Sequence, residues 1–111
     1  MLPSINRLTK KKDFDAVFKE GKIVKSGFLL FKTAKNHLKE SRFGFIVSKK
    51  VSSKATVRNK IKRRLREAVF TKLKDIKNPQ DVIIIALAGI EKKEFSEIQE
   101  TINNYLQKIN V

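Results

Sequence analysis

The chain has 111 residues, with 26 Lys or Arg against 11 Asp or Glu, so its formal net charge is +15. This length suits one domain, expected to span residues 1–111, and 41% apolar residues are enough for a hydrophobic core. The sequence has no cysteine, which excludes disulfides and thiolate sites. It also has no apolar run long enough for a membrane span or a secretion signal. These features predict a cytoplasmic protein.

A first helix is predicted for residues 12–20. Its apolar residues are spaced by three and four, which puts Phe14, Val17 and Phe18 on one face. Gly21 follows, and glycine is the most frequent residue just beyond a helix end. The helix therefore presents an apolar face that is mostly aromatic.

Three strands are predicted next, in segments rich in aromatic and branched residues, at 23–24, 28–33 and 43–47. The polar segment 35–41 is expected to join the second and third strands as a hairpin loop. Leu29 and Phe31 lie two apart in the second strand, so their side chains share one face of the sheet.

The second half of the chain alternates helix, strand and helix. A helix over 56–74 carries one apolar stripe, formed by Val57, Ile61, Leu65, Ala68, Val69 and Leu73. After Pro79, the apolar run 82–87 predicts a strand buried on both faces. The last helix has apolar residues spaced by three and four: Phe95, Ile98, Ile102, Tyr105 and Ile109. This order, αβββαβα, predicts an α+β fold, an α-β sandwich in which helices cover one sheet.

The positive charge is concentrated in the middle of the chain. Residues 42–74 carry twelve Lys or Arg and a single acid, Glu67, whereas residues 75–111 carry more acids than cations. Solubility needs a charge of only about 2–8 with mixed signs, so this concentration favours a polyanionic partner, nucleic acid in particular. The alternative is a solvated basic surface.

The helix over 56–74 combines an apolar stripe with a basic surface. Polar side chains lie opposite the stripe or at its boundary: Arg58, Asn59, Lys60, Lys62, Arg63 and Arg66. Such a helix can lay one face on a sheet and the other on phosphates.

Catalytic side chains are scarce. His37 is the only histidine and lies in a polar loop, so the chain offers neither a nucleophile–base pair nor a His/Cys metal cluster. Asp13 and Asp15 point to different faces of the first helix, and no glycine-rich phosphate loop is present. Any catalytic groups are therefore expected on a partner.

Four blocks of sequence stand in a characteristic order: NRL at 6–8 followed by DFDAVFKEG at 13–21, RFGFIVSKK at 42–50, KATVRNKIKR at 54–63, and DVIIIA at 81–86. Together they closely resemble the bacterial ribonuclease P protein subunit, across nearly the whole chain. The family's Arg-Asn-Arg triplet reads Arg58-Asn59-Lys60 here, and a family tyrosine corresponds to Phe31. Lys60 keeps the charge of arginine but lacks its planar guanidinium fork.

The resemblance implies a fold like that of the second domain of ribosomal protein S5, a mixed four-stranded sheet with an unusual left-handed βαβ crossover. It implies a protein subunit of ribonuclease P, which assists endonucleolytic removal of the 5′ leader of precursor tRNA to give the mature 5′ end. The RNA subunit would carry the active site and hold most of the Mg2+. The partners are then ribonuclease P RNA and precursor tRNA, with no membrane, no small-molecule substrate and no catalytic residue on the protein.

The resemblance also implies two RNA-binding surfaces. The residues expected to bind the RNA subunit are Lys49, Lys50, Lys54, Arg58, Asn59, Lys60, Lys62, Arg63 and Arg66. The residues expected to line a leader-binding cleft between the first helix and the sheet are Phe14, Phe18, Leu29, Phe31, Ile46, Arg58 and Lys62. Aromatic rings stack on any base, which suits a leader of variable sequence, although aromatic residues also dominate cores. Asn59 is expected to orient a hydrated Mg2+ between protein and RNA.

Two other functions are compatible with parts of the sequence. A small structural or ribosomal RNA-binding protein explains the charge and the missing active site, but not the pairing of an aromatic helix with a basic one. A cationic membrane-surface protein fits less well, because the apolar stripe of 56–74 is needed to cover the sheet.

Overall fold

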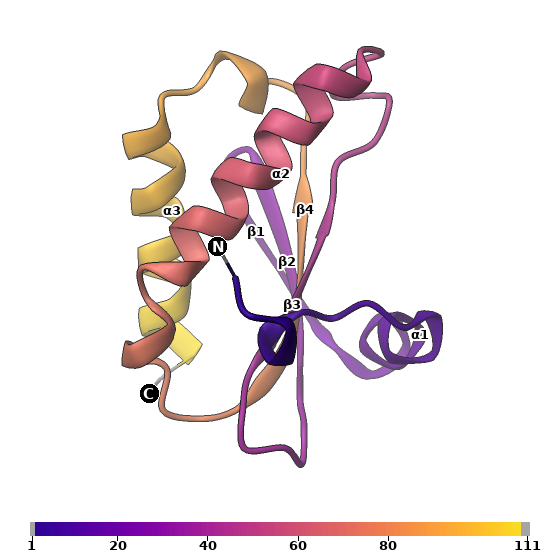
Figure 1. The fold of residues 1–111 in the computed structure, drawn as a ribbon, viewed down its shortest axis with the longest axis vertical. Helices are drawn as coiled ribbons and strands as arrows, with labels where there is room; N and C mark the ends of the chain where they lie inside the picture. Colours follow the sequence, from indigo (N-terminus) through magenta and orange to yellow (C-terminus); the bar gives the residue numbers. More distant parts are fainter. Residues whose placement is uncertain (1, 110–111) are drawn as a thin grey trace.

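Figure 1 shows the computed structural model, which describes residues 2–109. The predicted element order and the α+β class are confirmed by α1 (Lys11–Glu20), β1 (Lys22–Ser26), β2 (Leu29–Lys35), β3 (Arg42–Ile46), α2 (Ala55–Phe70), β4 (Gln80–Ala86) and α3 (Phe95–Ile109). Short 3-10 turns are formed by Ser4–Asn6, Leu73–Asp75 and Ile90–Lys92. Within the described residues, no helix is both long and apolar enough to cross a membrane.

The four strands form one mixed sheet in the order β1-β2-β4-β3. β2 pairs antiparallel with β1 and β4, whereas β3 pairs parallel with β4. The prediction that residues 35–41 form a hairpin loop between paired strands is therefore wrong, because β4 lies between β2 and β3. Val82, Ile83 and Ile84 of β4 are fully buried. β4 has apolar residues on both faces, and a strand of this kind is covered on every side only at the centre of a sheet.

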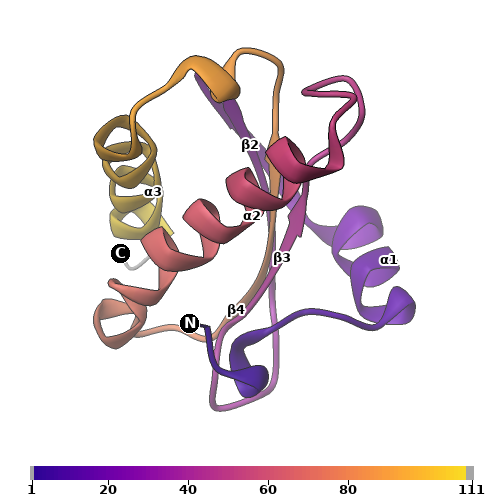
Figure 2. The ribbon, with the colours of Figure 1, turned by 45° about the horizontal axis from the view of Figure 1, so that its top comes forward.

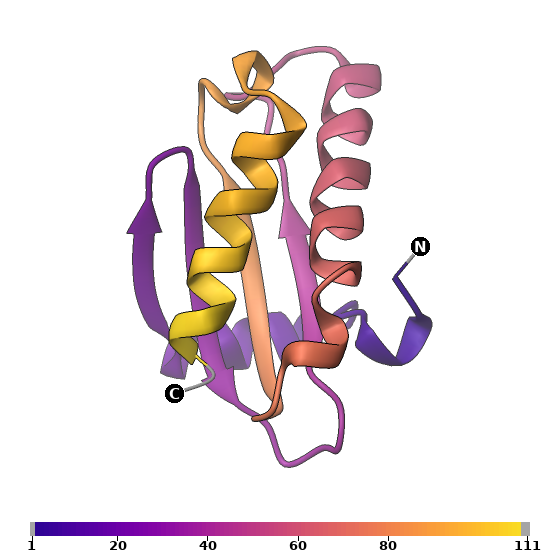
Figure 3. The ribbon, with the colours of Figure 1, turned by 90° about the vertical axis from the view of Figure 1, so that its left-hand side faces the viewer.

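β3, α2 and β4 form a βαβ unit of unusual hand. In Figure 3, β3 and β4 point the same way, α2 lies in front of the sheet, and β4 lies to the left of β3. This arrangement is the left-handed crossover implied by the resemblance, whereas nearly all such units are right-handed. In the same view α2 lies along the β3 edge of the sheet.

The two faces of the sheet are covered unequally. α2 and α3 pack on one face and α1 alone packs on the other (Figures 1 and 2). The face under α2 and α3 holds the main core, which includes Leu29, Phe31 and Phe43. The face under α1, called the α1 face below, has a small buried cluster of Leu8, Val17 and Ile83. The α1 face is therefore the thinner layer.

α2 ends at Phe70, four residues before the predicted end. The Thr71 amide donates to the carbonyl of Glu67 at 3.2 Å, and its hydroxyl donates to the carbonyl of Ala68 at 2.9 Å. Leu73 then begins a 3-10 turn that leads the chain to β4. The apolar stripe seen in the sequence thus continues past the helix, since Leu73 still packs on the core.

Candidate nucleic-acid interface

α2 buries its predicted stripe and exposes its predicted cations. Ile61, Leu65, Ala68 and Val69 are buried against the sheet and α3. The polar side chains divide into two groups: Asn59, Lys60, Arg63 and Arg66 are exposed, and Arg58 and Lys62 are half-buried. The face assignment made from the sequence is therefore confirmed.

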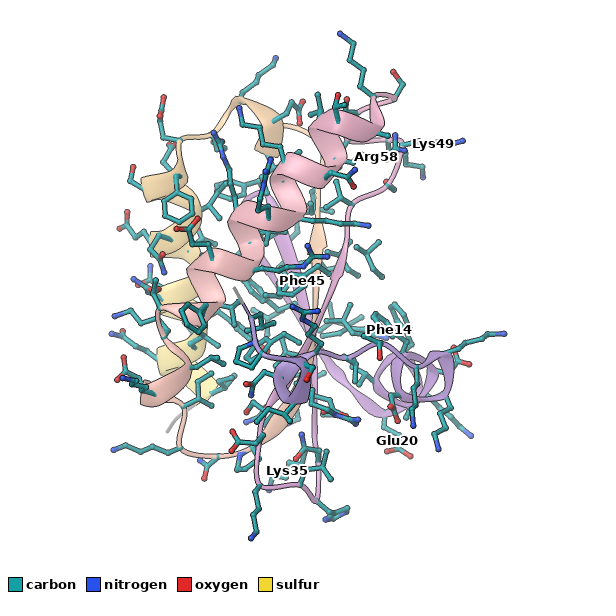
Figure 4. All side chains as sticks on the ribbon, viewed as in Figure 1. Phe14, Glu20, Lys35, Phe45, Lys49 and Arg58 are labelled. Atoms are coloured by element: carbon teal, nitrogen blue, oxygen red, sulfur yellow. The ribbon has the colours of Figure 1, made fainter. Side chains whose placement is uncertain are left out.

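The loop between β3 and α2, residues 47–54, adds three exposed lysines, Lys49, Lys50 and Lys54. Serine hydroxyls shape this loop: the Ser48 hydroxyl accepts from the amide of Lys50 at 3.3 Å, and the Ser52 hydroxyl from the amide of Lys54 at 3.2 Å. The Arg58 guanidinium donates to the carbonyl of Ser52 at 3.0 Å and so ties the loop to the start of α2. Figure 4 shows Lys49 and Arg58 together at this end of the molecule. The loop and α2 thus form one continuous basic surface.

No acidic side chain neutralises this surface. Within residues 2–109, none of the cations of the loop or of α2 between Arg58 and Arg66 forms an ion pair. Glu67 is the only acid on α2. A polyanion can therefore bind without first displacing an internal carboxylate.

A shallow groove runs along β3, between the N-terminal segment, α1 and α2. Its volume is about 120 Å³, and its lining residues are Arg7, Leu8, Thr9, Phe14, Phe43, Gly44, Phe45 and Arg66. We call it the β3 groove. The ring of Phe14 lies directly over Gly44, where a Cβ atom would overlap its Cζ and approach its Cε1 to 2.8 Å. Glycine at this position is what lets α1 approach the sheet so closely.

The cations of α2 extend along the β3 groove. Arg58, Lys62 and Arg66 are spaced by four, so they lie along one side of the helix. Arg66 lines the groove, and the other two therefore continue in the direction of loop 47–54. A chain of three cations thus connects the basic surface to the aromatic side chain of Phe14.

Part of the α1 face has no helix over it. Leu30, Ile85 and Ile46 pair across β2, β4 and β3 in one row, and all three are only half-buried. Ile85 is only half-buried although β4 is a central strand. α1 crosses only part of this face (Figure 1), and the buried cluster that includes Val17 of α1 contains Ile83 and not Ile85. On α1, Phe18 is 40% exposed.

Phe18 lies beside a cation. The Lys32 ammonium is 5.0 Å from the centroid of the Phe18 ring and donates to the Phe18 carbonyl at 2.5 Å. A ring with a cation next to it is suited to hold a base and its phosphate together. Phe14 and Ile46 pack against the small cluster of the α1 face, and Phe18 contacts Lys32 on β2, so all three lie on the α1 side of the sheet.

Two residues predicted for the cleft lie elsewhere. Leu29 and Phe31 have no exposed surface and point into the core between the sheet and α3. The ring of Phe31 is stacked on that of Tyr105, with centroids 3.9 Å apart and planes 8° from parallel. The prediction was right that they share a face, but that face is the core. The α1 face of β2 carries Leu30 and Lys32 instead.

Burial raises the pKa of Tyr105 to about 12, an effect that the nearby Thr33 hydroxyl only partly offsets. The phenol therefore stays neutral up to strongly alkaline pH. Phe31 stacks on a neutral, buried ring and belongs to the structural core.

Six of the eight groove residues were not predicted as site residues, and two of them, Arg7 and Phe45, carry side chains suited to RNA. Arg7 belongs to the segment NRL, which stands out in the sequence only as a family motif, and its guanidinium donates to the carbonyl of Leu2 at 2.8 Å. Phe45 is half-buried on edge strand β3 and packs beside the main core (Figure 4). Its ring is partly accessible because β3 is an edge strand with only one neighbouring strand, which the sequence did not indicate.

A polar network holds α1, β3 and β4 together. Arg42 on β3 donates to Asp81 on β4 through two nitrogens, at 2.9 and 2.6 Å, and to Asp13 on α1 at 3.1 Å. Asn36 donates to the same Asp81 carboxylate at 2.8 Å. The hydrogen bonds to Asp81 raise the pKa of Arg42, so its charge is permanent.

The residues that could meet a metal ion are few. Within residues 2–109, no group of three His, Asp or Glu side chains is arranged to hold an ion. Asn59 is exposed on α2 and offers one amide oxygen, which is a suitable ligand type for Mg2+. A single exposed amide does not hold an ion by itself, and its chemistry is compatible only with a hydrogen bond to the water shell of an ion that another molecule holds.

This arrangement has counterparts among known proteins. A protein-family model described as Ribonuclease P matches residues 2–110. The chain belongs to this family. Membership confirms the resemblance seen in the sequence, and the family's protein component is a subunit of an endoribonuclease that acts in tRNA processing.

Relatives and solved structures agree. The ribonuclease P protein component of Syntrophomonas wolfei is 36% identical over 100 residues, covering 90% of this chain and 83% of that protein. The component of Clostridium botulinum (strain 657 / Type Ba4) is 35% identical over 107 residues, 96% of each. The Staphylococcus aureus RNase P protein has a TM-score of 0.83 at 32% identity, over 96% of both chains. The Thermotoga maritima RNase P protein has a TM-score of 0.83 at 31% identity, over 92% of this chain and 96% of that one.

Proposed function

We propose that this protein binds the catalytic RNA of ribonuclease P and the 5′ leader of precursor tRNA, and so assists removal of the leader. The RNA subunit carries the active site. The protein acts in the cytoplasm with these two RNAs as partners, and it has no membrane or small-molecule substrate.

One observation carries the proposal: unpaired cations run from loop 47–54 along α2 to the aromatic residues of the β3 groove and the α1 face. The cations suit a folded RNA, whose phosphates are bound without reading sequence. The aromatic rings suit single-stranded RNA, because unpaired bases are free to stack on a protein ring. One surface can therefore hold the RNA subunit while the adjacent one holds the leader.

The RNA-subunit surface consists of the predicted residues of loop 47–54 and α2. Each phosphate neutralised there releases condensed counterions, which makes binding depend strongly on salt. The added positive charge lowers the amount of Mg2+ that the RNA assembly requires. Mg2+ at the active site is held mainly by RNA phosphates, and Asn59 contributes at most a hydrogen bond to the water shell of such an ion.

The leader surface differs from the predicted cleft. Phe14, Phe18 and Ile46 form its apolar side, and Arg58 and Lys62 form its cationic side. Leu30 and Ile85 take the place of Leu29 and Phe31, because they lie on the uncovered row of the α1 face. The leader therefore lies across α1 and the row Leu30–Ile85–Ile46.

Reconstitution with a bacterial ribonuclease P RNA tests the proposal. The protein alone should cleave no precursor tRNA, and the RNA with the protein should remove the leader at a Mg2+ concentration where RNA alone is inactive. Cleavage by RNA-free protein, or no effect of the protein on the RNA, would contradict the proposal. A structural RNA-binding protein of another kind would bind the RNA, and its charge could lower the Mg2+ requirement, but it would not make the holoenzyme prefer precursor to mature tRNA.

A further inference from the structure

α1 is held to the sheet by few apolar contacts. Val17 is the only residue of α1 that is fully buried, and it packs on Leu8 and Ile83. Phe14 is half-buried over Gly44, and Phe18 is largely exposed. A helix with so little buried apolar surface is weakly fixed unless polar contacts add to it.

The polar contact that fixes the first turn of α1 is the ion pair between Asp13 and Arg42, at 3.1 Å. Both side chains are mostly buried, with 20% and 22% of their surface exposed. Arg42 is itself immobilised by its two hydrogen bonds to Asp81, whose side chain is 11% exposed. Asp13 thus binds a guanidinium whose position is set by two strands.

The ion pair sits beside the aromatic part of the leader surface. Asp13 immediately precedes Phe14, and Arg42 is two residues from Gly44 on the same face of β3. The ion pair and the contact of Phe14 with Gly44 are therefore adjacent. Any movement of the first turn of α1 away from the sheet shifts Phe14 directly.

We propose that Asp13 and Arg42 are positioning residues for the leader surface, because their ion pair sets how closely α1 lies on the sheet. The proposal rests on the proposed leader binding. Neither residue has to touch RNA: the ion pair keeps Phe14 and Phe18 at a fixed distance from the row Leu30–Ile85–Ile46. A leader nucleotide then meets a surface that is already formed.

The chain supplies a matched control for this proposal. Asp13→Asn and Asp15→Asn each remove one negative charge from α1, so both change the net charge of the protein by the same amount. Asp15 is exposed and forms no ion pair within the described residues. Only Asp13→Asn should loosen α1. Asp13→Glu keeps the carboxylate and should restore much of the original behaviour.

The first measurement is amide hydrogen exchange of α1 in the free protein. Asp13→Asn should speed exchange in α1 by about two- to fivefold, a modest effect because Arg42 keeps its hydrogen bonds to Asp81, and Asp15→Asn should leave it unchanged. Equal exchange in the two variants would contradict the positioning role whatever the function of the surface.

The second measurement is the affinity of the holoenzyme for precursor and for mature tRNA. Asp13→Asn should reduce the precursor-to-mature ratio by about two- to fivefold, with the affinity for the RNA subunit unchanged. A wild-type protein without preference for precursor tRNA would contradict the proposed leader binding. A wild-type preference that survives equally in Asp13→Asn and Asp15→Asn would contradict the positioning role alone.

Discussion

The two faces of the sheet are built on different physical principles. The face under α2 and α3 buries a continuous apolar cluster that includes the stacked rings of Phe31 and Tyr105. The α1 face buries only a small cluster around Val17 and relies on the ion pairs of Arg42. Burial of apolar area is the larger stabilising term, so the first face supplies most of the stability.

The difference shows why the smaller layer can bind a ligand. A surface that receives single-stranded RNA has to leave aromatic and apolar groups accessible, and such groups cannot also be fully buried in the core. Phe18 and the row Leu30–Ile85–Ile46 are accessible because α1 covers only part of its face. Substitutions on the two faces should therefore differ in how much they lower the stability and how much they weaken leader binding.

The largest effect is expected for Phe31→Ala, on the core face. The substitution removes a fully buried ring and its stacking on Tyr105, so it should lower the free energy of unfolding by about 3–5 kcal/mol. Urea unfolding followed by circular dichroism measures this change. If the free energy of unfolding fell by less than about 1 kcal/mol and leader binding weakened, Phe31 would belong to the leader surface and not to the core.

Gly44→Ala should disturb the α1 face by a smaller amount. The added Cβ overlaps the Phe14 ring, so α1 has to move, at a cost of about 1–3 kcal/mol in the free energy of unfolding. Combining it with Phe14→Leu, which removes the ring, should recover part of this stability. Strictly additive effects in the double variant would mean that the two residues do not touch.

Alkaline pH should weaken the core face through Tyr105. An unfolded tyrosine loses its proton near pH 10, whereas the folded one keeps it to about pH 12, so stability falls as the pH rises between these values. The expected decrease is about 3 kcal/mol. Because lysines titrate in the same range, the measurement is the difference between wild type and Tyr105→Phe, whose unfolding should be less sensitive to pH by that amount. Identical pH profiles would contradict the raised pKa.

A surface cation should affect RNA binding without affecting folding. Arg63→Ala should reduce the salt dependence of binding to the RNA subunit by about 0.7–0.9 in the slope of log affinity against log salt, if the arginine neutralises one phosphate. Lys108→Ala removes an exposed cation from α3 and serves as the control, with no expected change in slope. Equal slopes for both variants would mean that Arg63 contacts no phosphate of the RNA subunit.

Most elements could be predicted because their signals are local. The apolar spacing of α1, α2 and α3 and the apolar run of β4 are visible in short segments of sequence. The position of β4 between β2 and β3 is not, since its pairing partners are about fifty residues before it or on the far side of α2. For this reason residues 35–41 resemble a hairpin loop when only the sequence is considered.

The site was predictable to the level of helix faces, but not of the faces of strands. The exposure of Arg63 and the burial of Leu65 follow from helical spacing, whereas alternation in β2 gives two faces without saying which helix covers each. Lys32 was the available clue: it marks the more polar face of β2 as the incompletely covered one, and Phe31 lies on the other. The contact of Arg42 with Asp13 and Asp81 joins residues 29 and 39 positions apart, so no local pattern encodes it.

The most direct test of the account is the Phe18→Ala holoenzyme, because Phe18 is the most exposed aromatic residue of the α1 face. Wild-type holoenzyme should prefer precursor to mature tRNA, increasingly as the leader lengthens to several nucleotides and then no further. Phe18→Ala should weaken precursor binding by about 1–3 kcal/mol if one base stacks there, leave mature tRNA binding unchanged, and change the free energy of unfolding by less than about 1 kcal/mol. A destabilised variant that loses affinity equally for both tRNAs would contradict the account, since it would place Phe18 in the structural core rather than on the leader surface.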